Sequence, residues 1–157
     1  MVWLILLLLS GCTTLPEPLQ GLPAETVSLD RIREHQTVLL GGQILRLQLE
    51  PERSWAEVVA YPLGRNGRPD LDRLPEGRFW FWTRDLLDPE VYQKGREVTV
   101  IGVVEGSRST TIGKRTLELP VIQAERYYLW PPREKEPVVI YAPPPAPYWY
   151  PPWHWCW

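Results

Sequence analysis

Cys12 is the residue whose chemistry stands out, because its thiol follows an apolar run and two small residues. Residues 2–9 are apolar and uncharged, and Ser10 and Gly11 separate them from Cys12. A helix that spans a bilayer needs about 20 apolar residues, whereas an export signal needs about 7–15 followed by small residues. A thiolate is nucleophilic enough to take up a lipid as a thioether. The pattern therefore predicts an export signal that ends next to the thiol of Cys12.

The segment Leu9-Ser10-Gly11-Cys12 resembles the bacterial lipobox, which implies cleavage before Cys12. That resemblance implies a diacylglycerol on the sulfur, an N-acyl chain such as palmitate on the new amino group, and no other cofactor. One acyl chain binds a membrane only marginally, so several chains anchor the protein permanently. Thr13 rather than Asp at the second mature position indicates the outer membrane. The alternative is an unprocessed buried strand with an incidental cysteine.

Aromatic and cationic residues in the middle of the chain form a second candidate site. The segment 78–82 reads Arg-Phe-Trp-Phe-Trp, and further arginines precede and follow it. Indole rings stack on flat ligands, and guanidinium groups bind phosphates. The candidate ligand-binding residues are therefore Arg68, Arg78, Trp80 and Trp82, within a wider group that includes Arg65, Arg73 and Arg84. The alternative is that these arginines form an ordinary solvated face.

No catalytic or metal-binding residue is predicted. Glu57, Asp85, Asp88 and Glu90 supply carboxylates for glycan hydrolysis, but nothing in the sequence fixes their separation. Asp88 is better interpreted as a helix cap. His154 and Cys156 give only two ligands, which do not close a metal site. We therefore expect a protein that is not an enzyme, with an envelope glycan hydrolase as the third hypothesis.

The C-terminal residues 131–157 have an unusual composition. They contain nine Pro and seven Tyr or Trp and show no periodic face. Prolines at this density favour extended polyproline II structure, and indole and phenol rings collect at the headgroup level of membranes. The predicted membrane-interface residues are Tyr148, Trp149, Tyr150, Trp153, Trp155 and Trp157. A solvated tail, a tail folded back onto the domain, or ring stacking on sugars are the alternatives.

The composition fits one ordinary globular domain. The chain has 157 residues, 44% of them hydrophobic, and a formal net charge of -2 from 17 basic and 19 acidic residues. No global positive field is available for a nucleic-acid backbone, so nucleic acid is not an expected partner. Two cysteines exclude a disulfide scaffold.

Alternating apolar residues between the two ends predict a small β-domain. Period-2 patterns indicate strands over residues 37–50, 55–61, 78–82, 96–105 and 114–123, the last continuing through 124–130. Gly41-Gly42 predicts a bulge or a sharp bend, and residues 106–110 predict a turn. Both faces of the strand at 96–105 are apolar and should be covered.

Residues 88–95 carry the signals of one short helix. Asp88 suits the N-cap, Pro89 the first turn and Gly95 the position after the end. Three strands, a helix that plugs one end and two or three further strands suit an OB-like fold. The predicted fold is therefore mainly β: a small antiparallel OB-like barrel with one short helix, flanked by a lipidated tether and a Pro/aromatic tail. A two-layer sandwich is the alternative.

An ordered set of short motifs resembles the Slp family of outer-membrane lipoproteins, the starvation-inducible type of Gram-negative bacteria. The motifs are Gly41-Gly42-Gln43-Ile44, Tyr61-Pro62-Leu63, Arg68-Pro69, Gly77-Arg78-Phe79, Asp88-Pro89-Glu90-Val91-Tyr92, Gly95 to Gly102 and the closing Trp130. Leu40 departs from the family pattern, in which a Trp is expected before the glycine pair. The resemblance implies a cell-envelope protein and locates it better than it explains its biochemistry.

The expected organisation is a signal peptide at 1–11, a tether at 12–35, the β-domain at 36–130 and the tail at 131–157. We expect an outer-membrane lipoprotein at the periplasmic face, with a structural or envelope-binding role. Its partners would be the membrane and, by hypothesis, lipopolysaccharide or peptidoglycan. The alternative function is an OB-like module that binds envelope glycan or, with less support, nucleic acid.

Overall fold

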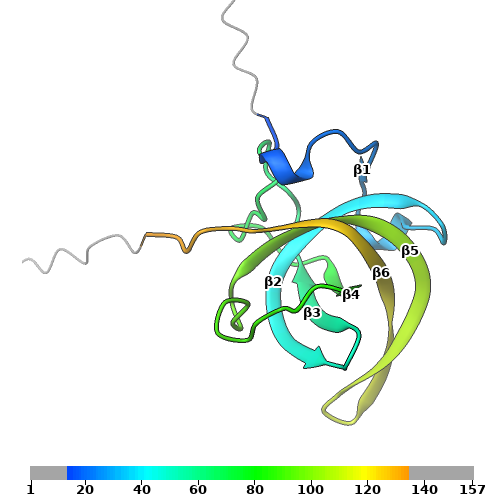
Figure 1. Ribbon diagram of the computed structural model, residues 1–157. Helices are drawn as coiled ribbons and strands as arrows, with labels where there is room; N and C mark the ends of the chain where they lie inside the picture. Colours follow the sequence, from blue (N-terminus) through cyan, green and yellow to red (C-terminus); the bar gives the residue numbers. More distant parts are fainter. Residues whose placement is uncertain (1–13, 135–157) are drawn as a thin grey trace, which may run out of the picture.

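Six strands and two short 3-10 turns make up the regular structure of residues 14–134, the part of the chain that the computed structural model describes (Figure 1). The elements are η1 (Glu17–Leu19), β1 (Glu25–Thr26), η2 (Leu29–Arg31), β2 (Thr37–Leu49), β3 (Ser54–Ala60), β4 (Gly77–Thr83), β5 (Glu97–Ile112) and β6 (Arg115–Leu129). The five predicted strands are confirmed, and the long final segment is continuous from Arg115 to Leu129.

The strands form one sheet that closes partly into a ring. Their order is β1-β2-β3-β4-β6-β5, and β2 also pairs with β5. The link between β4 and β6 is parallel and extends only from Trp80 to Trp82 on β4, whereas the other pairings around the ring are antiparallel. β2 therefore contributes to two sides of the ring, and Figure 1 shows its strong curvature.

Alternation along the strands separates an inner from an outer face. Phe79 and Phe81 of β4 are fully buried within the main core, together with side chains of β2, β3, β5 and β6. The intervening Trp80 and Trp82 belong to a separate cluster on the other face. β5 is likewise covered on both faces, since Val100 lies in the main core and Ile101 in a third cluster. The prediction of two covered faces is confirmed there.

Gly41 and Gly42 lie where β2 passes from β5 to β3. Gly42 pairs with Val98 on one side and Ala60 on the other. A Cβ on Gly42 would lie 1.8 Å from the backbone oxygen of Val59, so no side chain fits. The bulge itself comes later, between Ile44 and Arg46. The glycine pair thus allows close backbone approach at the change of partner.

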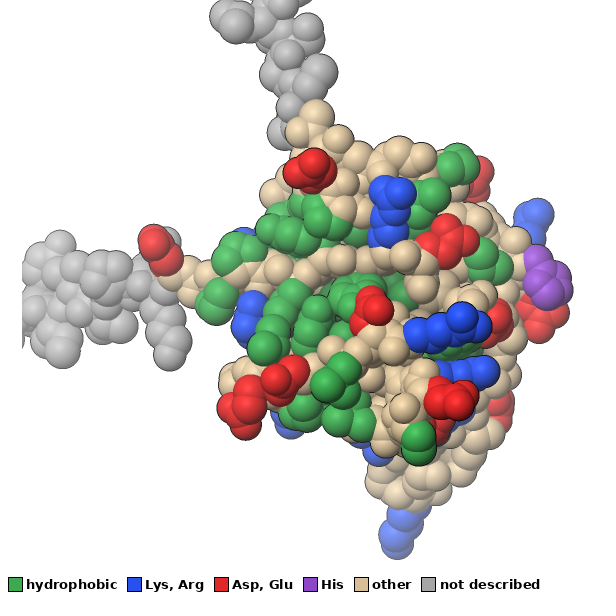
Figure 2. Space-filling view, viewed as in Figure 1, with side chains coloured by type: hydrophobic (Ala, Val, Ile, Leu, Met, Phe, Trp, Pro, Cys, Tyr) green, Lys and Arg blue, Asp and Glu red, His purple; other side chains and the backbone are tan. Residues whose placement is uncertain are grey.

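The prediction of a helix over residues 88–95 is wrong. Only one turn forms, in which the amide of Tyr92 donates to the Asp88 carbonyl at 2.8 Å, and the Asp88 carboxylate accepts from the Glu90 amide at 2.9 Å. Asp88 therefore caps a turn, as its side chain suggests, but the chain does not continue from this turn into a helix. The loop still closes the end of the ring, because Leu87 is fully buried in the core. The loop also exposes Leu86 and Val91. Figure 2 shows apolar side chains gathered in the middle of one face of the molecule.

The prediction of a turn at residues 106–110 is also wrong. β5 continues to Ile112, and the hairpin turns at Gly113 and Lys114 instead. Gly106 lies in a register shift between Val104 and Ser107, opposite the stretch of β6 that holds Pro120. A bulge tolerates the missing amide of proline, which explains how Pro120 fits inside a long strand. The β5–β6 hairpin therefore extends well beyond the ring (Figure 1).

The first part of the N-terminal segment, from Leu15 to Ala24, lies along the outer face of the sheet, whereas Val27, Leu29 and Ile32 pack against the main core. Leu19 is 1% exposed and packs with Leu39 of β2 and Ile101 of β5. β1 pairs in parallel with the start of β2, from Glu25 to Thr26. This contact accounts for the covered outer face of β2 and β5.

The end of the described chain is fixed by a buried carboxylate. Glu97, 6% exposed, accepts from Arg68 Nε and from Arg133 Nε, each at 2.8 Å. Burial raises the pKa of Glu97, but the hydrogen bonds from the two guanidinium groups outweigh it and hold the pKa below its ordinary value. The pair of ion contacts ties residues 131–134 to the start of β5.

Replacing Gly42 with Ala should lower the free energy of unfolding by about 1–3 kcal/mol, because the new methyl group collides with the Val59 carbonyl. Denaturant unfolding of the full chain measures the change. Gly64→Ala is the matched control, since the added Cβ there would meet its neighbours at 3.4 Å or more. Equal stability of the two variants would contradict the close-approach explanation.

Replacing Glu97 with Gln should cost about 1.5–3 kcal/mol of unfolding free energy near neutral pH. The folded pKa is depressed, so the stabilisation is complete above the ordinary value of 4.5 and disappears as the pH falls through the lower folded value. Unfolding of wild type and variant at about pH 7 and about pH 2.5 measures this, with the exposed Glu52→Gln as control. A difference that persists unchanged in acid would contradict it.

Candidate functional site

Three indoles form a layer on the outer face of β3 and β4. The register places Trp55 of β3 opposite Trp82 of β4, with Trp80 beside them. The ring centroids of Trp55 lie 6.5 Å from Trp80 and 6.2 Å from Trp82, within the range of favourable aromatic contacts. Leu119 and Val121 of β6 complete this cluster.

The β5–β6 hairpin covers the indole layer. Trp80 Nε1 donates to Thr110 Oγ1 at 2.7 Å, and Trp82 Nε1 donates to the Glu105 carboxylate at 2.9 Å. The two side chains are only 2% and 5% exposed. Trp80 and Trp82 therefore serve as a floor under the hairpin, and neither ring offers an open face to a ligand.

Three arginines lie over these rings. Arg53 is 4.4 Å from the centroid of Trp82, Arg46 is 5.2 Å from that of Trp80, and Arg108 is 4.5 Å from Trp55 and 4.8 Å from Trp80. Cation–π contacts at these distances hold guanidinium planes in place. The surface presented to solvent is consequently cationic, over an aromatic layer.

Glu57 balances part of this charge from within the sheet. It is 2% exposed and accepts from Arg46 Nε at 2.6 Å and from Arg78 Nη1 at 3.1 Å. A carboxylate that is buried and bonded to two guanidinium groups has no access to a substrate. This geometry gives Glu57 a structural task and does not support a role in proton transfer.

A cavity of about 440 Å³ lies between β2 and the hairpin. Its lining includes two guanidinium groups, an amide and three hydroxyl groups but no carboxylate: Arg46, Leu47, Gln48, Trp80, Arg108, Ser109, Thr110 and Thr111. A second hollow of about 360 Å³ shares Arg46 and Thr111 with it and adds Arg78, Lys94 and Glu57. Together we call these two hollows the arginine groove.

The four candidate ligand residues do not form one surface. Arg78, Trp80 and Trp82 lie on the same face of β4, but Arg68 lies near the chain's described end. There its guanidinium group contacts Glu97 and lies 5.5 Å from the Trp130 ring centroid. The positive charge of Arg68 is therefore already paired with the Glu97 carboxylate. Arg46, Arg53 and Arg108, which sequence reasoning missed, occupy the positions over the indoles instead.

Asp85 and Asp88, two of the other carboxylates considered for catalysis, accept hydrogen bonds from neighbouring groups. Asp85 accepts from the Tyr127 hydroxyl at 2.8 Å. Burial raises the pKa of Tyr127, and its bond to Asp85 raises it further, so this phenol stays protonated at ordinary pH. Burial also raises the pKa of the neighbouring Tyr92. This Tyr–Asp cluster fastens β6 to the loop after β4.

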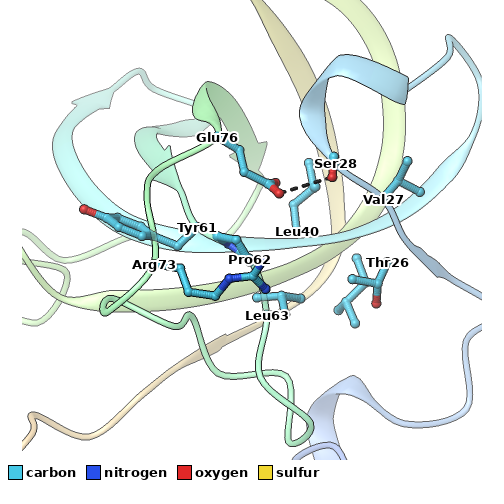
Figure 3. A pocket seen from close by; sticks show the side chains of 10 residues that line it. Thr26, Val27, Ser28, Leu40, Tyr61, Pro62, Leu63, Arg73 and Glu76 are labelled. Atoms are coloured by element: carbon cyan, nitrogen blue, oxygen red, sulfur yellow. Dashed lines mark hydrogen bonds between the residues drawn. The ribbon is translucent and has the colours of Figure 1, made fainter.

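A smaller cavity of about 230 Å³ separates the N-terminal segment from β2 and the loop after β3 (Figure 3). Thr26, Val27 and Ser28 form one wall, and Tyr61, Pro62 and Leu63 lie across from them. Ser28 donates to the Glu76 carboxylate at 3.1 Å and bridges the two walls. Arg73 also lines the cavity, so both charge signs are present there.

Several predictions fall outside residues 14–134: the lipid on Cys12, the pair His154 and Cys156, and the interface residues Tyr148, Trp149, Tyr150, Trp153, Trp155 and Trp157. Among the residues that are described, no cluster of three metal-binding side chains occurs. That same part of the chain contains no helix with the length and apolar character required to cross a membrane.

Comparison with known proteins identifies relatives across nearly the whole chain. The uncharacterized lipoprotein YeaY of Escherichia coli K12 is 27% identical over 92% of this chain and 76% of its own. The outer membrane protein Slp of the same organism is 22% identical over 81% and 71%. Among solved structures, a small single-stranded DNA-binding protein from Streptomyces coelicolor superimposes with a TM-score of 0.39 at 12% identity, covering 62% of this chain and 95% of its own.

The family model of these lipoproteins matches residues 9–156, which include the lipobox-like segment, all the described strands and the aromatic tail. The resemblance inferred from the ordered motifs is therefore confirmed. The chain belongs to the outer membrane lipoprotein Slp family.

Proposed function

We propose that this protein is a lipoprotein held at the periplasmic face of the outer membrane by acyl chains on Cys12, with a structural or envelope-binding role and no catalytic activity. In this proposal the ring of strands is a small OB-like barrel. The observation that carries the proposal is that both ends of the described chain leave the domain beside one loop, residues 64–69. Membership of the outer membrane lipoprotein Slp family supports the location at the outer membrane.

The N-terminal end contacts this loop through Leu15. An added Cβ on Gly67 would lie 2.4 Å from Leu15 Cδ2, so the two residues are in direct contact. Leu15 and Leu63, the residue before this loop, both pack against the cluster of Leu19, Leu39 and Ile101. Leu15 is three residue-to-residue steps from Cys12, a distance of at most about 11 Å along the chain. A lipid on Cys12 would therefore hold the loop close to the bilayer.

The C-terminal end reaches the same loop by three contacts. Arg133 donates to the Pro69 carbonyl at 2.8 Å, and Arg68 donates to the Pro131 carbonyl at 2.8 Å. Trp130 Nε1 donates to Thr99 Oγ1 at 2.8 Å, and that hydroxyl donates to the Gly67 carbonyl at 2.7 Å. Figure 1 shows both ends leaving at the side of the loop after β3.

This convergence favours attachment at both ends over attachment by the lipid alone. The tail starts on the side of the domain that a short lipid anchor would hold near the membrane. Its tyrosines and tryptophans have the composition of membrane-interface segments. Binding to lipopolysaccharide sugars through the same rings is the second source of affinity at that surface.

Replacing Cys12 with Ser should release the protein from the outer membrane, because no thioether can form. Fractionation of the native host should find wild type in the outer membrane, extracted only by detergent, and the variant in the soluble periplasmic fraction. Cys156→Ser is the matched control and should stay with the membrane. Wild type that washes off without detergent and carries no acyl groups by mass spectrometry would overturn the proposal.

Replacing Trp149, Trp153, Trp155 and Trp157 with Ser should weaken vesicle binding by at least about tenfold, because four interfacial indoles are lost. Co-sedimentation with phosphatidylethanolamine/phosphatidylglycerol vesicles measures this in the Cys12→Ser chain, where no lipid masks the effect. A chain with Pro143, Pro144 and Pro145 changed to Ser is the control. Equal vesicle binding by the Cys12→Ser chain, its tryptophan variant and its proline variant would contradict a membrane role for the tail.

A further inference from the structure

The arginine groove has a charge and donor pattern that the fold alone does not require. Arg46 and Arg108 line its larger cavity without any carboxylate in the lining. Arg46 Nε is paired with Glu57, but its side chain is 55% exposed. The cavity of about 440 Å³ falls within the range typical of small-molecule sites.

Arg108 supplies the most specific observation. Its Nη2 donates to Gln48 at 2.8 Å, and its guanidinium plane is held over Trp55 and Trp80. Its Nη1 is buried and finds no hydrogen-bond partner within the described part of the chain. A buried charged donor without an acceptor costs free energy, which an incoming oxyanion would recover.

The groove's neutral groups add a second kind of recognition. Gln48, Ser109, Thr110 and Thr111 line the same cavity. The Thr110 hydroxyl already accepts from Trp80, the Ser109 hydroxyl bonds to Glu118 and the Gln48 oxygen accepts from Arg108, so the Gln48 amide nitrogen and the Thr111 hydroxyl are the neutral groups that a sugar hydroxyl would meet. In the adjoining hollow Arg78 is paired with Glu57, and Lys94 adds a further positive charge.

We propose that the arginine groove binds an anionic saccharide, with its phosphate or carboxylate between Arg46 and Arg108 and its hydroxyls on Gln48 and the hairpin. The choice of a saccharide rests on the proposed envelope location. The β5–β6 hairpin extends to the end of the molecule opposite residue 14 (Figure 1). With the lipid anchor at the membrane, the groove therefore faces away from the bilayer and toward soluble or cell-wall glycan.

Titration of the purified full-length protein in detergent with N-acetylglucosamine 1-phosphate tests this, read out by tryptophan fluorescence and calorimetry. The fluorescence responds because Arg108 lies on two indoles. We expect saturable binding of the sugar phosphate, at least tenfold weaker binding of inorganic phosphate, and no binding of neutral N-acetylglucosamine at the same concentrations. Inorganic phosphate that binds as tightly as the sugar phosphate would overturn the saccharide assignment.

Arg108→Gln should weaken binding at least tenfold. Arg115→Gln, the same charge change at the exposed end of the hairpin outside the groove, should leave it unchanged. Arg46→Gln supplies a second test at a half-exposed position if the Arg108 variant unfolds. Equal affinities of the groove variants and the Arg115 variant would overturn the site, as would the absence of binding by the wild type. Because Cys12-dependent membrane retention is measured separately, loss of this binding with retention intact refutes the groove alone.

Discussion

The close approach of two backbones at Gly42 is the constraint on which the rest of the structure depends. β2 can pair with β5 along its first half and β3 along its second only if the chain turns there without a side chain. That exchange of partners brings the two ends of the sheet together. It fixes an inner face of aliphatic and phenylalanine side chains and an outer face on which polar and indole side chains collect.

Strand positions were predictable because their period-2 patterns are set by burial of one or both faces. The strand predicted at 78–82 is β4, which carries Phe79 and Phe81 on one face and Trp80 and Trp82 on the other. The helix at 88–95 failed because its cap residues specify only how a helix begins. The chain is drawn instead into a loop whose Leu87 fills the core, with its amide donating to Ser54 Oγ, 33 residues earlier. The residues of the segment 88–95 alone do not indicate that tertiary contact.

The candidate site was predictable only in part, for a related reason. Trp80 and Trp82 are recognisable as chemistry-bearing residues, yet what covers them depends on how far β5 continues past Gly106. The sequence around Gly106 has the composition of a turn, but the bulge opposite Pro120 lets the strand proceed. Arg108 is far in sequence from Arg46 and Arg53, and only the ring and its hairpin bring all three over one indole layer.

The hairpin that covers the indoles is anchored by side chains well before its own tip. Thr110 and Glu105 make the contacts to Trp80 and Trp82, whereas Gly113 and Lys114 lie beyond them and are exposed. Insertions or deletions at the tip would therefore leave the ring's architecture intact. The length and composition of the tip are therefore decoupled from the contacts that hold the hairpin on the indoles, as is usual for exposed loop tips.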